Sequence, residues 1–205
     1  MSLVQQAKER LVAHQPQTLA LDFPEAGVLL PLTNEPEPTI ILTRRSDRLR
    51  THRGQVALPG GRRDETDGSL IETALRESQE EIALPPNQVE VIGALDQVVS
   101  RFGILVTPYV GVIPPELEFQ PNPDELDAVF KVPVSFFLED RRKRTDVLSF
   151  RGMTLHVPCW QFEKFEIWGL SAIILTNFVN VAFDAGIQMV HYQSERQVKD
   201  GMGQR

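Results

Sequence analysis

The chain has very little cysteine, no long apolar run and no excess of positive charge, and each of these shortages excludes a class of protein. A single cysteine, Cys159, cannot form an intramolecular disulfide framework or a cysteine-rich zinc site. No apolar run approaches the roughly 20 residues needed to span a bilayer. The N-terminal segment carries charges where a secretory signal is apolar. We therefore expect a soluble, cytoplasmic protein without a membrane partner.

The charge balance excludes a further class. The formal net charge is −7 at pH 7, which argues against general nucleic-acid binding through a basic surface. The arginines are nevertheless concentrated between residues 44 and 63. An acidic protein with one basic patch is suited to a small polyanion as its partner.

The composition fits one globular domain. The 205 residues are 41% hydrophobic and 24% charged, which provides a sizeable core and is not typical of a disordered chain. We expect a single domain over 1–205 with a core of about 24–190. An amphipathic helix over 3–13 precedes this core, and a polar tail follows residue 190.

Short apolar runs separated by turns predict the strands. The runs at 26–32 and 39–43 flank a proline-containing turn and predict a hairpin. The basic run 141–144 is expected to be a solvated loop. A long apolar helix over about 169–184 is expected to be deeply packed or part of a homodimer contact. Other strands are expected near 55–58, 89–98, 104–113, 128–132, 146–150 and 153–157. Strands interspersed with a few helices predict an α/β fold with a mixed sheet covered by helices.

A helix over about 70–82 carries the most informative side chains. Ser69 and Glu72 form a capping-box signature for its start. Glu77, Glu80 and Glu81 fall within an arc of about 100° on one face. Like-charge neighbours at this spacing cost on the order of 0.2–0.5 kcal/mol each. A divalent cation removes this repulsion, and magnesium and manganese prefer such carboxylate oxygens.

An acidic helix face alone is more often simply solvated. Three further features favour a metal site here. A Gly60-Gly61 break precedes the helix, Asp67 lies between the two, and the opposite face of the helix is apolar. The glycines allow the backbone to approach an ion or a phosphate closely.

The segment 60–84, GGRRDETDGSLIETALRESQEEIAL, resembles the Nudix box. It departs from that pattern in having Asp67 where Glu is usual, eight rather than seven residues between Asp67 and Arg76, a less apolar Ser78, and Ala83 where Gly is usual. The matching positions are Gly61, Asp67, Arg76, Glu77, Glu80 and Glu81.

The resemblance implies a fold and a reaction. The fold is the Nudix α/β/α sandwich, a mixed sheet between helices with a catalytic loop-helix-loop. The reaction is Mg²⁺-dependent (or Mn²⁺-dependent) cleavage of a diphosphate linkage in a nucleotide. The implied metal ligands are Gly61, through its carbonyl, Glu77, Glu80 and Glu81. Arg76 would orient a carboxylate, and Glu81 or Glu125 would serve as the general base.

A second stretch, 41–61 (ILTRRSDRLRTHRGQVALPGG), is similar to the signature that precedes the Nudix box in coenzyme A diphosphatases. This resemblance implies that coenzyme A or a derivative is cleaved to adenosine 3′,5′-bisphosphate and 4′-phosphopantetheine. The implied substrate-binding residues are Arg45, Ser46, Arg50, Gly54 and Gly60.

Two other functions are compatible with the same residues. A hydrolase of ADP-ribose or another nucleoside-diphosphate-linked substrate would share the box without needing the upstream arginine signature. A non-catalytic Nudix-fold binding module is less favoured, because such modules usually lose the Glu-Glu pair that this chain keeps as Glu80 and Glu81.

Overall fold

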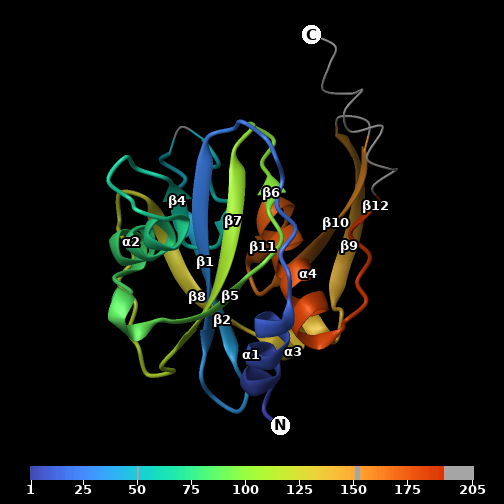
Figure 1. Ribbon diagram of the computed structural model, residues 1–205, viewed down its shortest axis with the longest axis horizontal. Helices are drawn as coiled ribbons and strands as arrows, with labels where there is room; N and C mark the ends of the chain where they lie inside the picture. The colour runs from blue at the N-terminus through green and yellow to red at the C-terminus, as the bar shows by residue number, and fades with distance from the viewer. Residues whose placement is uncertain (50, 151–152, 192–205) are drawn as a thin grey trace.

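The computed structural model describes residues 1–49, 51–150 and 153–191. Arg50 and the predicted polar tail beyond residue 191 lie outside the described residues. The described chain forms an 8-stranded sheet and a 4-stranded sheet with helices packed on both sides of the larger one (Figure 1). Within these residues, no helix is both long and apolar enough to cross a membrane.

The larger sheet is mixed and is organised around β1 (Glu25–Thr33). β1 runs parallel to β7 (Leu105–Ile113) along its whole length and antiparallel to β2 (Thr39–Arg45). The pairing of Leu32 with Ile40 confirms the predicted hairpin. The other strands of this sheet are β3 (Val56–Ala57), β4 (Gly60–Arg62), β5 (Glu90–Ala94), β6 (Val98–Val99) and β8 (Leu126–Pro133).

The smaller sheet corrects one expectation. The predicted loop at 141–144 is wrong, because Arg142 begins β9 and Arg144 pairs with Cys159 of β10. The Arg144 guanidinium forms ion pairs with Asp146 and Glu166, so neighbouring side chains neutralise its charge. This sheet consists of β9 (Arg142–Phe150), β10 (Met153–Phe162), β11 (Phe165–Ile167) and β12 (Val190–His191).

The helices divide the interior into two clusters. α2 (Leu70–Ile82) packs on one face of the larger sheet, and its cluster includes Leu29, Ile41 and Ile82. The larger cluster lies on the other face and joins both sheets. The helices of this larger cluster are α1 (Leu3–Ala13), α3 (Val134–Leu138) and α4 (Gly169–Phe183). A short 3₁₀ turn, η1 (Pro86–Gln88), follows α2.

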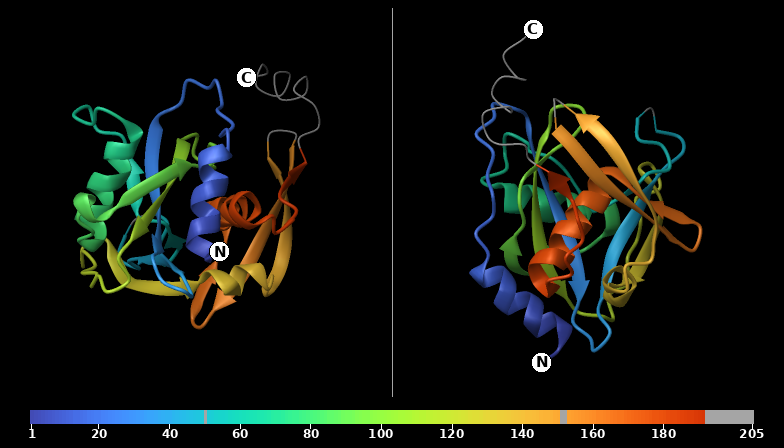
Figure 2. Two further views of the ribbon diagram at one scale, coloured as in Figure 1. Left: turned by 60° about the horizontal axis from the view of Figure 1, so that its bottom comes forward. Right: turned by 90° about the vertical axis from the view of Figure 1, so that its right-hand side faces the viewer.

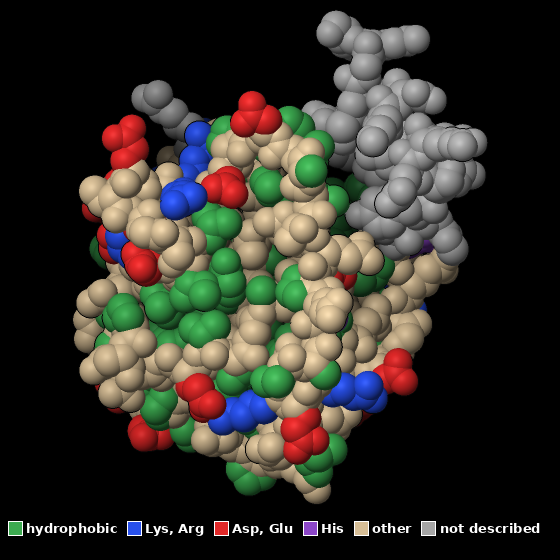
Figure 3. Space-filling model, viewed as in Figure 1, with side chains coloured by type: hydrophobic (Ala, Val, Ile, Leu, Met, Phe, Trp, Pro, Cys, Tyr) green, Lys and Arg blue, Asp and Glu red, His purple; other side chains and the backbone are tan. Residues whose placement is uncertain are grey.

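α4 lies between the two sheets (Figure 2). Its apolar side chains on several sides, including Leu175 and Phe178, are fully buried within the chain, so deep packing explains its composition. Cys159 is also fully buried, as its role as a small hydrophobe requires. On the face shown in Figure 3, charged side chains lie mostly around the edge, and apolar side chains lie nearer the centre, over α2, β1 and β7.

The start and end of α2 follow from local chemistry. Ser69 accepts a hydrogen bond from the Glu72 backbone N–H, and Glu72 accepts one from Gly68. Ala83 ends the helix in the left-handed conformation, with φ of 56°. Glycine adopts that conformation without a Cβ penalty, which explains why glycine is usual at this position in the Nudix pattern.

α2 and β1 approach each other too closely for a side chain at Gly27. A Cβ atom there would lie 2.2 Å from the Leu70 carbonyl oxygen and 3.1 Å from the Ala74 nitrogen. Because backbone atoms cannot move aside cheaply, we expect Gly27→Ala to lower the free energy of unfolding by about 3 kcal/mol or more. Urea denaturation measures this change.

Gly68→Ala provides the matched control. A Cβ atom at Gly68 meets only the flexible end of Glu72, at 3.0 Å. We expect this variant to change the free energy of unfolding by less than about 1 kcal/mol. Equal stability losses in the two variants would contradict the close α2–β1 approach.

Candidate active site

The candidate site lies where α2 meets β4. The Glu77 carboxylate rests against the Gly61 backbone, and a Cβ atom at Gly61 would lie 2.4 Å from its carboxyl carbon. Gly60 has a φ of 147° and packs on Gly27 and Val28 of β1. A side chain at Gly60 would therefore clash with the β1 backbone, whereas a side chain at Gly61 would displace the Glu77 carboxylate.

Arg76 connects the loop, the strand and the helix of this site. Its Nε and Nη2 atoms each donate to one oxygen of Asp67, both at 2.9 Å. The Asp67 carboxylate is buried and also accepts from the Thr73 hydroxyl. The hydrogen bonds from Arg76 hold the pKa of Asp67 well below its usual range. Nη2 also donates to the Arg62 carbonyl, at 3.3 Å.

The same guanidinium holds two of the predicted metal ligands. Arg76 Nη1 lies 2.9 Å from Glu77 Oε1 and 3.1 Å from Glu80 Oε2. Glu77 is largely buried, and burial raises its pKa although the Arg76 contact opposes this shift. Glu80 is more exposed, at 58% of its side chain, and lies on the outer side of the cluster.

Glu81 is the most deeply buried of the three glutamates, with 4% exposure. Its carboxylate accepts a hydrogen bond from the Gly60 N–H at 3.1 Å and lies 3.8 Å from Arg45 Nη1. Burial raises the pKa of Glu81 to about 7, because these two contacts offset only part of the desolvation. A buried carboxylate with so little compensation is typical of functional sites.

Glu125 lies within electrostatic reach of the glutamates on α2. Repulsion from Glu125 adds to the burial effect that raises the pKa of both Glu77 and Glu81. The Asn122 N–H donates to the Glu81 carbonyl oxygen at 2.8 Å, which anchors the loop that carries Glu125. The loop that carries Glu125 therefore lies beside the glutamates of α2.

The predicted substrate-binding residues divide into two groups. Arg45 faces Glu81, and its Nε atom is buried without a hydrogen-bond partner among the described residues. Gly60 lies in the site itself. Ser46, by contrast, is fully buried, and its hydroxyl accepts from the Arg48 N–H. Gly54, with φ of 64°, closes the turn of this loop. Ser46 and Gly54 therefore shape the loop rather than face a ligand.

Sequence reasoning missed the ion pairs that hold this arginine loop. Arg44 lies 2.8 Å from Asp47 and 2.7 Å from Asp127, and the Asp47 N–H also donates to Asp127. No local signal identifies Asp127, because it comes from a strand that pairs with β2 across a long sequence separation.

The carboxylates of this site are candidate ligands for a divalent cation. Among the described residues, no three acidic, histidine or cysteine side chains already form a metal-binding group. The predicted cluster is divided between two sets of contacts, because Arg76 holds Glu77 and Glu80 while Glu81 contacts Gly60. The oxygen donors of Glu77, Glu81 and Glu125 beside a glycine strand nevertheless fit a hard cation.

Comparison with known proteins identifies the family. The model of the NUDIX domain matches residues 23–148. The chain belongs to the Nudix family. It is 44% identical over 166 residues to a Nudix hydrolase of Klebsiella pneumoniae (strain ATCC 700721 / MGH 78578), named NudL and described as uncharacterized, covering 81% of this chain and 86% of the relative. A NudL protein of Escherichia coli O1:K1 is also 44% identical, covering 76% of this chain and 81% of the relative.

A solved structure supports the same fold. The MutT/nudix family protein from Enterococcus faecalis is 17% identical, with a TM-score of 0.55, covering 92% of this chain and 71% of that chain. The Nudix fold predicted from the box is thus confirmed. As a Nudix pyrophosphohydrolase, the chain belongs to enzymes that generally use divalent metal ions and act on small nucleotide-linked substrates.

The buried charge of Glu81 predicts a pH-dependent stability. Its folded-state pKa of about 7 lies above the unfolded value of about 4.3. Ionisation of Glu81 therefore lowers the free energy of unfolding progressively between about pH 4 and pH 7. Glu81→Gln removes this cost, so in chelator the variant should exceed the parent by on the order of 3 kcal/mol at pH 8 and by little at pH 4.

Urea denaturation at the two pH values measures the difference. Glu80→Gln is the matched control, because its exposed side chain should change stability by less than about 1 kcal/mol at either pH. A Glu81→Gln effect of the same size at pH 4 and pH 8 would show that ionisation of Glu81 is not its cause.

Proposed function

We propose that this Nudix hydrolase cleaves the diphosphate linkage of coenzyme A or a derivative, with Mg²⁺ or Mn²⁺ as cofactor. Water adds across one P–O–P bridge, and the products are adenosine 3′,5′-bisphosphate and a 4′-phosphopantetheine compound. The observation that carries this proposal is the placement of the arginine stretch 41–61 against the box. Arg45 from that stretch lies 3.8 Å from Glu81.

Glu77 and Glu81 are the proposed principal metal ligands, one helical turn apart on α2, with Glu80 and the Gly61 carbonyl as further ligands. When bound, the cations would neutralise the diphosphate, polarise phosphorus and lower the pKa of a bound water. Arg76 would keep Glu77 against Gly61, as its 2.9 Å contact supports.

The remaining side chains would handle the substrate and the proton. Glu81 can accept a proton near neutral pH, because burial raises its pKa to about 7. Glu125 is the second candidate base, since its charge acts on both Glu77 and Glu81. Arg45 would bind a phosphate oxygen, which is supported by its unpartnered Nε among the described residues.

Each of the two alternative functions leaves one feature of the molecule unexplained. An ADP-ribose hydrolase would use the same carboxylates but leaves the arginine signature at 41–61 without a role. A binding module without catalysis leaves unexplained why Glu81 is kept as a buried carboxylate at a cost in stability.

Product analysis tests the substrate. Coenzyme A, ADP-ribose and a dinucleoside polyphosphate are incubated with the enzyme, with and without Mg²⁺, and the products are identified by mass spectrometry. We expect adenosine 3′,5′-bisphosphate from coenzyme A, only with the metal present. Cleavage of ADP-ribose with at least a tenfold higher kcat/KM would favour the alternative instead.

Glu81→Gln tests the assignment of the metal ligands. We expect kcat to fall by about a hundredfold or more, because a ligand and a candidate base are both removed. Glu80→Gln should lose less, since Glu80 lies on the exposed side of the cluster. Circular dichroism checks that each variant is folded. Near-normal turnover of folded Glu81→Gln would refute the assignment.

A further inference from the structure

A groove of about 600 Å³ opens beside the candidate site. Phe23, Pro24 and Glu25 line one side, and residues 62–65 line the other. The antiparallel pairing of Arg62 with Ala26 and of Gly61 with Gly27 fixes its position. Arg62 is thus the next residue after Gly61, about 3.8 Å away between Cα atoms, and Gly61 contacts Glu77. Because successive side chains of a strand point to opposite faces, the Arg62 side chain lies across β4 from Glu77, and the groove begins on the other side of this strand from the proposed diphosphate site.

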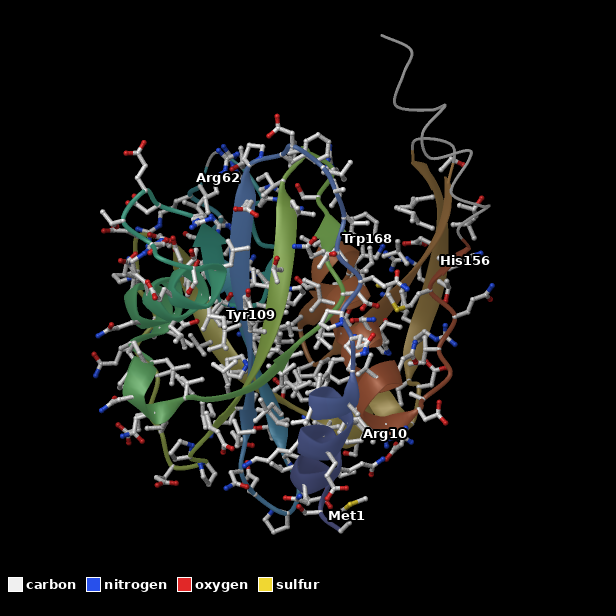
Figure 4. All side chains as sticks on the ribbon, viewed as in Figure 1. Met1, Arg10, Arg62, Tyr109, His156 and Trp168 are labelled. Atoms are coloured by element: carbon white, nitrogen blue, oxygen red, sulfur yellow. The ribbon has the colours of Figure 1, made fainter. Side chains whose placement is uncertain are left out.

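The groove is lined by two arginines and three carboxylates, and one of the arginines, Arg62, has no ion-pair partner among the described residues. Arg63 forms an ion pair with Glu25 at 3.1 Å and donates to the Asp67 carbonyl. Asp64 accepts hydrogen bonds from the backbone and hydroxyl of Thr66. The Arg62 side chain, in contrast, makes no ion pair or hydrogen bond within the described chain, and it lies at the end of β1 where basic and acidic side chains meet on the surface (Figures 3 and 4).

An unpaired guanidinium next to a diphosphate site is suited to a second anionic group. Its planar donors can bind two oxygens of one phosphate, which distinguishes a phosphomonoester from a neutral hydroxyl. The groove is within the size range of small-molecule sites. Phe23 and Pro24 supply an apolar wall beside the guanidinium, which matches the mixed character of a phosphorylated nucleoside.

We propose that Arg62 binds the ribose phosphate of a 3′-phosphorylated adenosine diphosphate substrate and so selects such substrates over those with a free 3′-hydroxyl. The proposal rests on the proposed function and assigns this groove to the nucleoside side of the scissile bond. The diphosphate lies at Gly61 and the ribose phosphate at the following residue. Arg45, which lies 3.8 Å from Glu81, is left to the diphosphate itself.

The selectivity of the enzyme tests the role of Arg62. We measure kcat/KM for coenzyme A and for 3′-dephospho-coenzyme A and compare their ratio in the parent and in Arg62→Gln. We expect the ratio to fall about tenfold to a hundredfold, mainly through a higher KM for coenzyme A. Arg62→Lys keeps the charge but not the bidentate geometry, and its ratio should lie between the two.

Arg10→Gln is the matched control. Arg10 is an arginine on α1 at the opposite end of the molecule from Arg62 (Figure 4), and its substitution should leave the ratio at the parent value. An equal loss for both substrates in Arg62→Gln would place Arg62 on the diphosphate and overturn the proposal. An unchanged ratio would overturn it as well.

A binding measurement separates this proposal from the proposed function. Titration calorimetry compares the affinities of the protein for adenosine 3′,5′-bisphosphate and for AMP, and neither titration needs turnover. We expect the bisphosphate to bind the parent at least tenfold more tightly than AMP and to lose that advantage in Arg62→Gln. Equal affinities in the parent overturn the ribose-phosphate site even if coenzyme A is hydrolysed. Absence of coenzyme A hydrolysis together with preferential bisphosphate binding would overturn the proposed function alone.

Discussion

The bidentate contact between Arg76 and Asp67 sets the geometry on which the whole candidate site depends. Both carboxylate oxygens are used at 2.9 Å, so the loop before α2 is fixed relative to the helix. The same guanidinium reaches Glu77, Glu80 and the carbonyl of Arg62, which fixes the distance between the helix and the glycine strand. Two departures from the Nudix pattern are thereby related. An aspartate is one methylene shorter than a glutamate, and we infer that the extra loop residue brings this shorter carboxylate to Arg76.

The site gathers more negative charge than its own cations offset. Arg76 is engaged by three carboxylates, while Glu81 has only one backbone N–H and a distant arginine within the described residues. Repulsion from Glu125 increases the imbalance. In isolation this arrangement lowers stability, because buried carboxylates prefer to be neutral. The excess of negative charge suits a site for divalent cations, because bound cations would balance the charges of both the carboxylates and a diphosphate.

Local patterns predicted the bounds of the helices well, whereas strand pairing and the partners chosen by charged side chains could not be predicted from them. The bounds of α2 follow from the Ser69 cap and the spacing of its apolar residues, which are both within one helix. The position of Arg144 in a strand depends on Cys159, which lies in β10 and pairs with it across a hairpin. Likewise, the helical spacing of Glu77, Glu80 and Glu81 predicted their shared face, but not that Arg76 would hold the first two apart from the third. That outcome depends on Asp67 and on the sheet beneath.

The upstream arginine stretch has a structural role that its sequence pattern conceals. The Ser46 N–H donates to the Glu125 carbonyl oxygen at 2.8 Å, and Arg44 forms an ion pair with Asp127, two residues later. The loop that presents Arg45 and the segment that carries Glu125 are thus one connected unit. Ser46 and Gly54 belong to the substrate signature although one faces the protein interior and the other lies in a turn. Their role is to determine where the proposed phosphate-binding arginine and the candidate base lie relative to the carboxylates of α2. Recognition of the substrate and placement of the base are therefore coupled through the backbone.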